Sequence, residues 1–598
     1  MQSFEDIAIM GTSHLTANFI ILLVLLSSAH LEAVYANEAG SYYDSFATTK
    51  CVSLPLASSY GGGIIVNPEF DNGMDGWSAF GGSKLEIRSD EGGNKYIAAT
   101  ERKNSCDSAS QNLNLTQDLM YTLAAWVQIS GENSSAAIVK ATVAMKDPNT
   151  GSTTYNCAGT AIAQSGCWTQ LKGGLTADFS SSATIYFEST DVGVEIFLDS
   201  VSLQPFTKEE WRSHQQASIE KNRKGNVTVH VVDSEGNPVK GAKIMINQIK
   251  REFPFGSAIA KTILANDTYQ KWFVERFNVA TFENELKWYS TENQQGYLNY
   301  KDADALVEFC NSNNISMRGH NIFWEDPKYT PQWVKDLPDT QQLQSAVESR
   351  IRSLVGRYKG QFLNWDVSNE MLHFSFFENK LGPNASLEFF KLAQELDPTT
   401  PMFMNDYNTI ETCNDIMAIP DEYLRKLQDI SSLGVMTGIG LESHFGKANI
   451  PLMRSILDRL GSIGLPIWLT EVDIQNSLGG DKQAEYLEEV LREGYSHQFV
   501  NGIVMWSALH PYGCYQMCLT DNNFNNLATG NVVDKLIEEW NNESIEGITD
   551  ENGEFKFFGF RAYYKAIVMH LELSNSTTFK VTRVSTTTYQ PQQIYIVI

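Results

Sequence analysis

The sequence predicts a multidomain protein whose largest part is a (β/α)8 TIM barrel, preceded by a smaller β-sandwich. Three observations predict this fold class. A chain of 598 residues is too long for one hydrophobic core. Apolar runs typical of buried parallel strands alternate with amphipathic helical stretches from residue 253 to 572. Residues 61–206 instead contain short strand-like runs separated by turn residues, without a helical period.

Charge limits the kinds of partner that the protein can have. Asp and Glu number 71 and Lys and Arg number 45, so the net charge is -26. This balance argues against nucleic acids and anionic membranes, because both are polyanions. A neutral polymer remains compatible, and the 12 Trp and 24 Tyr supply rings of the kind that stack on sugars.

Residues 1–36 resemble an export signal or an uncleaved anchor. Residues 18–29 form an apolar run shorter than a bilayer span, and residues 34–36 offer a cleavage point. The basic start of an ordinary signal is missing, since Lys50 is the first basic residue, and a misassigned start codon would also explain this. Export to the cell wall is favoured by eight Asn-x-Ser/Thr sites, at Asn114, Asn133, Asn226, Asn266, Asn314, Asn384, Asn542 and Asn575.

The eight cysteines fit an oxidising compartment without requiring a disulfide scaffold. Cys157 and Cys167 flank a short turn-rich segment and are candidates for a disulfide. Cys514 and Cys518 lie together on a late loop, as a disulfide or as two buried thiols. Their spacing is a weak metal signal without a second Cys/His pair nearby, so no metal is predicted.

The first domain is expected to be a β-sandwich of the jelly-roll type over residues 61–206. Alternating or β-branched runs occur at residues 84–87, 121–129, 137–145, 183–187 and 194–201.

A linker and a β-hairpin are expected over residues 207–252. Residues 209–224 are charged and Gln-rich, which is typical of a linker or an exposed helix. Residues 226–247 form two alternating runs around a turn at residues 233–238, which predicts a hairpin. Residues 573–598 are expected to form a C-terminal tail.

The TIM barrel is predicted from eight apolar runs with helices between them. Residues 340–358 and 482–493 carry the apolar stripe of amphipathic helices. The candidate strands are residues 255–259, 277–284, 315–324, 362–367, 402–408, 435–444, 465–473 and 500–506.

Polar side chains follow strand after strand, which predicts an active site at the carboxyl end of the barrel. Glu370 follows one buried strand, and Glu471 lies on another about a hundred residues later. A single acidic residue at a strand end is ordinarily a solvated one. Two carboxylates delivered in this way are what cleavage of a glycosidic bond requires.

Five motifs resemble those of glycoside hydrolase family 10, and their sequences are like those of the plant members. They are WDVSNE at residues 365–370, TEVD at 470–473, ENELKW at 283–288, RGH at 318–320 with Trp324, and NDYN at 405–408. The resemblance covers the whole barrel and implies a retaining endo-1,4-β-xylanase that acts on xylan without a cofactor. A monomer is expected.

The first domain resembles family 22 carbohydrate-binding modules at residues 65–71 and 196–203. The aromatic and arginine residues that grip xylan in such modules are not found at the expected places around Phe80 and Cys106. Sugar binding and a spacer or docking role are therefore equal alternatives for this domain.

The family resemblance implies a role for each matching residue. Glu370 would be the general acid and base, Glu471 the nucleophile, and Asn369 the partner of the sugar 2-hydroxyl. His444 and Asp473 would support the nucleophile. The remaining substrate-binding residues would be Glu283, Asn284, Lys287, His320, Trp324 and Trp506.

Three positions depart from the family pattern. Glu325 stands where many relatives have His, Glu442 stands where many have Gln, and no second tryptophan follows Trp506. These changes bear on subsite preference and pH optimum. Two other functions stay open: a retaining β-glycosidase acting on mannan or glucan, and a non-catalytic wall-binding protein, which would not need both glutamates.

Overall fold

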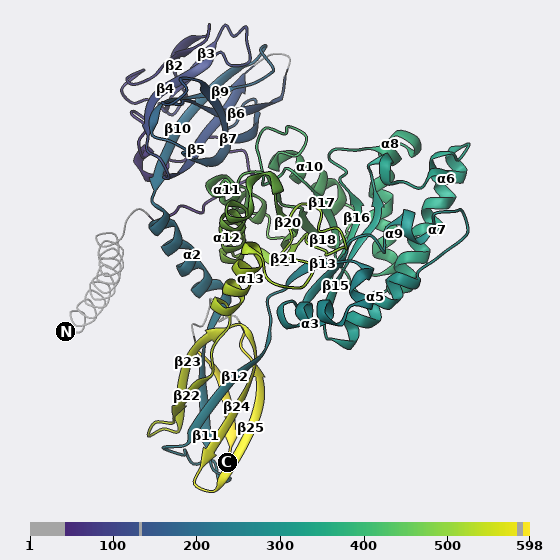
Figure 1. Cartoon of the computed structure of the whole chain (residues 1–598). Helices are drawn as coiled ribbons and strands as arrows, with labels where there is room; N and C mark the ends of the chain where they lie inside the picture. Colours follow the sequence, from purple (N-terminus) through teal and green to yellow (C-terminus); the bar gives the residue numbers. More distant parts are fainter. Residues whose placement is uncertain (1–41, 131–133, 583–589) are drawn as a thin grey trace, which may run out of the picture.

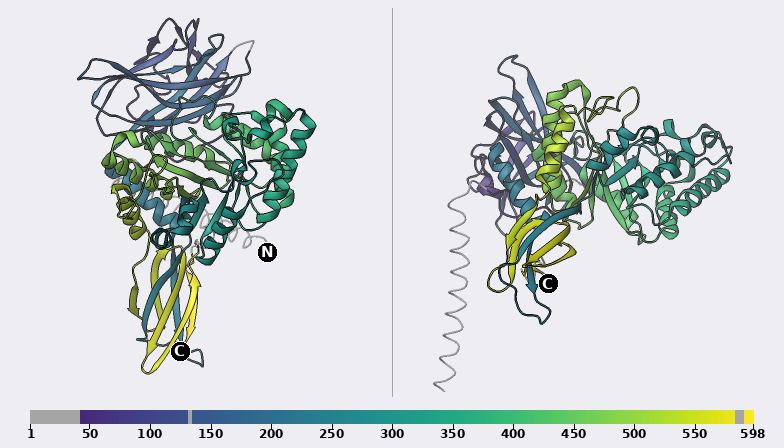
Figure 2. Two further views of the ribbon diagram at one scale, coloured as in Figure 1. Left: turned by 45° about the vertical axis from the view of Figure 1, so that its right-hand side comes forward. Right: turned by 60° about the horizontal axis from the view of Figure 1, so that its bottom comes forward.

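The computed structural model describes residues 42–130, 134–582 and 590–598 and has three folded units (Figure 1). The barrel lies between an N-terminal β-sandwich and a second, C-terminal β-sandwich, and the left view of Figure 2 shows the same order. The expected signal or anchor at residues 1–36 and the site at Asn133 lie outside the described residues. Within the described ranges, no helix has both the length and the hydropathy to cross a membrane.

The N-terminal domain is the predicted β-sandwich. Its ten strands form one sheet in the order β1-β4-β9-β6-β7-β8-β5-β10-β3-β2. Neighbouring strands of this sheet, such as β5 and β10, pair in an antiparallel direction. One continuous apolar core fills the space between the layers. The strands are β1 (Ser78–Phe80), β2 (Lys84–Ser89), β3 (Lys95–Thr100), β4 (Ser108–Leu115), β5 (Met120–Ser130), β6 (Ala136–Lys146), β7 (Thr153–Gln164), β8 (Thr169–Thr176), β9 (Ser181–Glu188) and β10 (Glu195–Phe206).

The barrel has the eight predicted parallel strands. They follow one another around the barrel, and pairing of β18 with β20 closes the sheet. The strands are β13 (Phe255–Ile259), β14 (Val279–Phe282), β15 (Ser316–Trp324), β16 (Trp365–Asn369), β17 (Met402–Asp406), β18 (Thr437–Leu441), β20 (Ile467–Ile474) and β21 (Val500–Met505), with the short β19 (His444–Phe445) beside β20.

Helices surround the barrel, and α7 illustrates why its sequence is helical. The Asp339 side chain accepts a hydrogen bond from the Gln342 N–H and caps the helix start. Leu343, Val347 and Ile351 then bury one face at helical spacing. The helices are α3 (Asp267–Arg276), α4 (Trp288–Thr291), α5 (Lys301–Ser312), α6 (Gln332–Lys335), α7 (Thr340–Tyr358), α8 (Phe376–Leu381), α9 (Ala385–Leu396), α10 (Pro420–Ser431), α11 (Ile450–Gly461), α12 (Gly480–Ser496) and α13 (Ala528–Glu539).

The hairpin expected in residues 226–247 forms only at its turn, where the Val239 N–H donates to the Val231 carbonyl at 2.9 Å, because its two strands belong to different sheets. Strand β11 pairs with β23 and β26, whereas β12 pairs with β22 and β24. The two sheets bury their apolar faces against each other. The C-terminal β-sandwich therefore consists of segments that precede the barrel in the sequence and segments that follow it. Its strands are β11 (Lys224–Val232), β12 (Lys243–Arg251), β22 (Ile545–Ile548), β23 (Glu554–Phe560), β24 (Ala562–His570), β25 (Leu573–Lys580) and β26 (Gln592–Val597).

This second sandwich also corrects two expected boundaries. Residues 545–572 were expected to belong to the barrel. Helix α13 is the last barrel helix, so these residues belong to the second sandwich instead. Residues 573–598 are not a tail, because β25 and β26 pair within the sandwich.

The segment expected to be a linker or an exposed helix is a helix, α2 (Lys208–Arg223), and it is packed rather than fully exposed. Thr207 and Glu210 form a capping box at its start. The buried Trp211 donates its indole N–H to Glu493 on α12 at 2.8 Å. The helix therefore fixes the path of the chain along the barrel rather than serving as a flexible spacer.

Two disulfides differ from the expected Cys157–Cys167 pair, which is wrong. Cys157 bonds to Cys413 in the barrel, and Cys167 bonds to Cys51. Cys157 lies in the middle of β7, whereas Cys167 follows the end of that extended strand, so the strand itself keeps them apart. Cys514 and Cys518 form a third disulfide.

The N-terminal sandwich is bound to the barrel by more than the disulfide. Lys172 on β8 forms an ion pair of 2.9 Å with Asp458 on α11, and only 5% and 3% of these side chains are exposed. The Tyr43 hydroxyl donates to the same carboxylate at 2.6 Å. At the rim of the interface, Lys447 pairs with the exposed Asp178.

Replacing Lys172 by methionine should destabilise the protein by roughly 2 kcal/mol, because Asp458 loses a buried charged hydrogen-bond partner while Arg454 and His497 remain beside it. Lys447→Met is the matched control, since it removes an exposed ion pair at the same interface and should cost less than about 1 kcal/mol. Thermal unfolding of the three proteins measures the difference. Equal midpoints for both variants would contradict the view that Lys172 secures the domain.

Candidate active site

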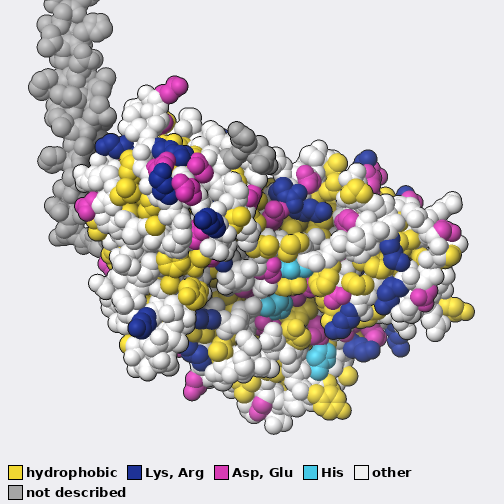
Figure 3. All heavy atoms as spheres, turned by 90° about the horizontal axis from the view of Figure 1, so that it is seen from above, with side chains coloured by type: hydrophobic (Ala, Val, Ile, Leu, Met, Phe, Trp, Pro, Cys, Tyr) yellow, Lys and Arg dark blue, Asp and Glu magenta, His cyan; other side chains and the backbone are white. Residues whose placement is uncertain are grey.

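The carboxyl ends of the barrel strands surround one cleft of about 420 Å³. Figure 3 shows acidic and histidine side chains gathered together in the middle of the face seen from above. The cleft brings together every predicted site residue except Asp473, which lies behind His444. The predicted residues that line it are Glu283, Asn284, Lys287, His320, Trp324, Asn369, Glu370, His444, Glu471 and Trp506.

Glu370 follows the end of β16 in a left-handed conformation, with φ of 59°. Its N–H donates to the Asn405 carbonyl at 2.9 Å, which fixes this turn against the neighbouring strand β17. The side chain is 9% exposed. Burial raises its pKa to about 7, the nearby Trp324 indole N–H opposes this effect, and the negative charges of Asp406 and Glu471 add to it. At neutral pH the group is close to half protonated.

Glu471 lies within β20 and is 5% exposed. One carboxylate oxygen accepts a hydrogen bond of 3.0 Å from the Asn405 amide. Burial by itself would raise its pKa, but its interactions with His320, His444 and Lys287 lower it to about 2. The two glutamates therefore differ in protonation: Glu471 stays ionised under conditions in which Glu370 holds a proton.

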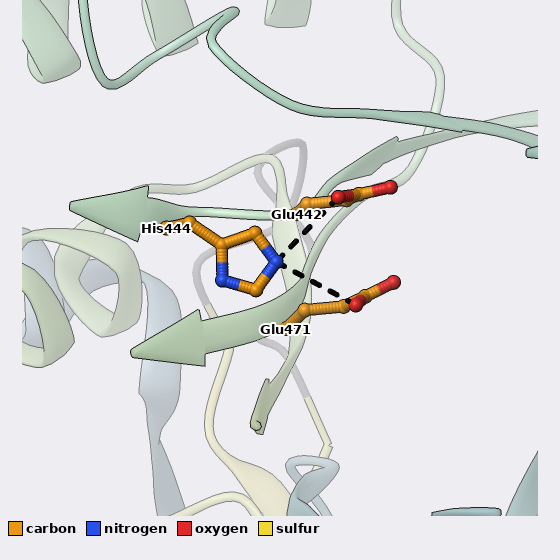
Figure 4. A group of neighbouring side chains, drawn as sticks. All are labelled: Glu442, His444 and Glu471. Carbon is orange, nitrogen blue, oxygen red and sulfur yellow. Dashed lines mark ion pairs between the residues drawn. The ribbon is translucent and has the colours of Figure 1, made fainter. Parts of the chain in front are cut away.

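His444 joins Glu471 to two further carboxylates. Its Nδ1 lies 2.9 Å from Asp473, and its Nε2 lies 3.6 Å from Glu471 and 3.5 Å from Glu442 (Figure 4). Burial lowers its pKa, but Asp473, Glu442 and Glu471 together raise it well above the usual value. The imidazole is held in one orientation by Asp473 and carries positive charge toward the nucleophile.

The nitrogen and oxygen atoms that Glu442, His444 and Glu471 could offer to a metal ion lie within 4.8 Å of one another. Amide side chains of Asn369 and Asn405 already supply hydrogen bonds to these carboxylates. His444 is the common ion-pair partner of the two carboxylates in this group.

One wall of the cleft is aromatic and encloses a lysine. The Lys287 ammonium lies 4.3 Å from the ring centre of Trp324 and 5.6 Å from that of Trp506. Tyr329 stacks on Trp324 at 3.7 Å, which leaves this indole with a fixed orientation. Lys287 is 4% exposed, and burial lowers its pKa. Rigid rings and a directed ammonium suit recognition of sugar hydroxyls.

His320 and Asn369 are held by partners beneath the cleft. His320 Nδ1 lies 2.9 Å from Asp366, which also forms a 2.5 Å ion pair with the fully buried Arg318. The Asn369 carbonyl oxygen accepts from the Asn405 amide at 2.9 Å. His320 Nδ1 also lies 3.9 Å from Glu471, and the Asn369 amide donates to Glu442 at 3.2 Å, so both residues contact the carboxylates of the cleft.

Glu283 and Asn284 occupy the end of the cleft beyond β14. Glu283 is hydrogen-bonded to His510, whose pKa is raised by that contact. Asn284 accepts from the Tyr289 hydroxyl at 2.5 Å.

Several cleft residues were missed by sequence reasoning. Tyr407 lines the cleft within the NDYN motif and Tyr289 directly follows the ENELKW motif, so their positions were a usable signal. Tyr515 and Gln516 come from the loop closed by the Cys514–Cys518 disulfide, and nothing in the sequence indicates that this loop turns inward.

Comparisons with known proteins agree on the two domains. The model of glycosyl hydrolase family 10 matches residues 245–527, and that of a carbohydrate binding domain matches residues 62–193. An Arabidopsis thaliana protein named endo-1,4-beta-xylanase 5-like is 36% identical over 595 residues, covering 97% of this chain and 98% of its own. Endo-1,4-beta-xylanase 5 from the same plant is 38% identical over 500 residues, covering 82% of this chain and 86% of its own.

Proposed function

Because the chain belongs to glycosyl hydrolase family 10, we propose that it hydrolyses internal β-1,4-xylosidic bonds of xylan, with retention of configuration, outside the cell in the wall. The observation that supports this most is the contrast between two buried glutamates in one cleft, with a pKa of about 7 for Glu370 and about 2 for Glu471. A retaining glycosidase needs one carboxylic acid and one carboxylate.

In the first step, Glu471 attacks the anomeric carbon while Glu370 donates its proton to the departing glycosidic oxygen. A covalent glycosyl ester on Glu471 results, and the shortened chain leaves as an alcohol. In the second step, Glu370 accepts a proton from water, whose oxygen attacks the same carbon and releases Glu471.

The surrounding residues would act through positioning and charge. Asn369 reaches the 2-hydroxyl of the reacting sugar, and His444, oriented by Asp473, stabilises the ionised nucleophile. Lys287 and His320, with Glu283 and Asn284 beyond them, would bind the hydroxyls of the nonreducing side. Trp324 and Trp506 would form its walls.

Purified protein should release reducing ends from xylan and much less from mannan or cellulose, with a rapid fall in viscosity that marks internal cleavage. A preference for mannan or cellulose would redirect the proposal to another wall polysaccharide. No release from any of the three would overturn it.

The pH dependence of kcat/KM should show an alkaline limb near pH 7. Activity requires protonated Glu370, so it is lost as pH rises through its pKa of about 7. The acid limb should lie far lower, because Glu471 is protonated only near its pKa of about 2. Initial rates on a short xylo-oligosaccharide measure both limbs, and an alkaline limb below pH 5 would contradict the assignment of the acid.

A further inference from the structure

A third carboxyl group, that of Glu442, lines the same cleft beside Glu471. It follows the end of β18 and is 2% exposed. Its Oε1 accepts from the amides of Asn369 at 3.2 Å and Asn405 at 3.3 Å. Its Oε2 lies 3.5 Å from His444 Nε2. Both oxygens are therefore engaged by groups that also contact the reacting centre.

Glu442 and Glu471 compete for the same donors. The Asn405 amide contacts both carboxyl groups, and the single Nε2–H of His444 lies between them at nearly equal distances (Figure 4). One N–H cannot satisfy two anions, and two buried carboxylates this close repel each other. A proton on one of the two carboxyl groups would relieve both the repulsion and the competition.

The surroundings decide which one holds it. Glu471 interacts with His320, Lys287 and His444, all of which favour its ionised form. Glu442 receives neutral amide donors at Oε1, and burial, Glu471 and Glu370 raise its pKa well above the usual value. The titratable groups that act on Glu442 from the elements around it are Glu370, Glu471, His444, Lys287, Tyr407 and Tyr423.

We propose that Glu442 works as a neutral carboxylic acid, which positions Asn369 and the nucleophile through hydrogen bonds without adding a second negative charge. Oε2, 3.5 Å from His444 Nε2, would carry the proton, because Oε1 accepts from the two asparagine amides. The inference rests on the proposed function for its catalytic consequence, but its protonation state can be tested without activity.

The first test compares thermal unfolding of Glu442→Gln with the wild type between pH 5 and 8. A folded-state pKa above the unfolded value means that only the unfolded chain ionises in this range. The wild type therefore loses stability as pH rises, by up to tenfold in the folding equilibrium per pH unit for one proton. Glutamine has no such proton. The midpoint of Glu442→Gln should rise relative to the wild type as pH increases.

Glu348→Gln is the matched control, since it makes the same change on the exposed face of α7. Its difference from the wild type should stay flat from pH 5 to 8. A flat or falling difference for Glu442→Gln would show that Glu442 is ionised in the folded protein, and the proposal would be overturned.

The second test is the pH profile of Glu442→Gln on a short xylo-oligosaccharide. A neutral amide in place of a neutral acid should keep kcat/KM within about tenfold of the wild type and leave the alkaline limb at the same pH. Removal of an anion would instead lower the pKa of Glu370 and move this limb to lower pH, which would refute the proposal. A wild type inactive on xylan would refute the proposed function alone, because the unfolding test still decides the state of Glu442.

Discussion

Glu471→Ala should lower kcat on every substrate by roughly 10⁵-fold, the scale on which removal of an attacking nucleophile acts. No other carboxylate is held by Asn405 and His444 on the attacking side with a depressed pKa, among the residues that the structure describes. The loss should be as large on aryl xylosides with good leaving groups as on xylan, because the missing step is attack rather than protonation. Initial rates on both substrate types measure it.

Azide provides the control for Glu471→Ala. The small anion fits the space that the carboxylate leaves and attacks an activated aryl β-xyloside from the same face, so the product should be an α-xylosyl azide. Rescue with a β-xylosyl azide, or an undiminished rate on aryl xylosides, would assign the nucleophile to another residue.

Glu370→Ala should separate substrates by their leaving groups. Hydrolysis of xylan needs a proton on the departing oxygen, so its rate should fall by about 10²–10⁴-fold. Aryl xylosides with strongly acidic phenols need little protonation, and their glycosylation step should be nearly intact. Hydrolysis of the glycosyl ester on Glu471 then becomes slow, because the base of the second step is also missing. A burst of phenol followed by a slow steady state should appear in stopped-flow traces.

The same variant should lose the alkaline limb near pH 7 on activated substrates, since that limb comes from Glu370. Azide should restore turnover here through a β-xylosyl azide, because it attacks the glycosyl ester from the open face. Equal losses on xylan and on activated aryl xylosides would refute the acid and base role.

The barrel could be predicted because its signals are local. Each strand is a short apolar run, and β13 and α7 have the predicted bounds. The C-terminal sandwich was missed because β11 and β12 alternate like a hairpin, while their partners β23 and β24 lie some three hundred residues away. The Cys157–Cys413 bond was missed for the same reason, since no local pattern reports a contact between domains.

The site was predictable in its positions but not in its network. Strand ends delivered Glu370 and Glu471 to one cleft, as the barrel geometry requires. Sharing of Asn405 and His444 between Glu442 and Glu471 depends on side-chain directions that spacing does not give. The roles of the site residues remain predictions until variants are measured.

We expect Glu370 and Glu471 to act as a pair in a double displacement, and the anomeric configuration of the first product reports on both residues at once. Attack by Glu471 inverts the anomeric carbon, and attack by water inverts it again, so the product keeps the β configuration. Proton NMR during the first minutes of xylo-oligosaccharide hydrolysis, before mutarotation, should show the β-anomer first and the α-anomer growing later. An initial α-anomer would mean a single displacement by water and would contradict the account.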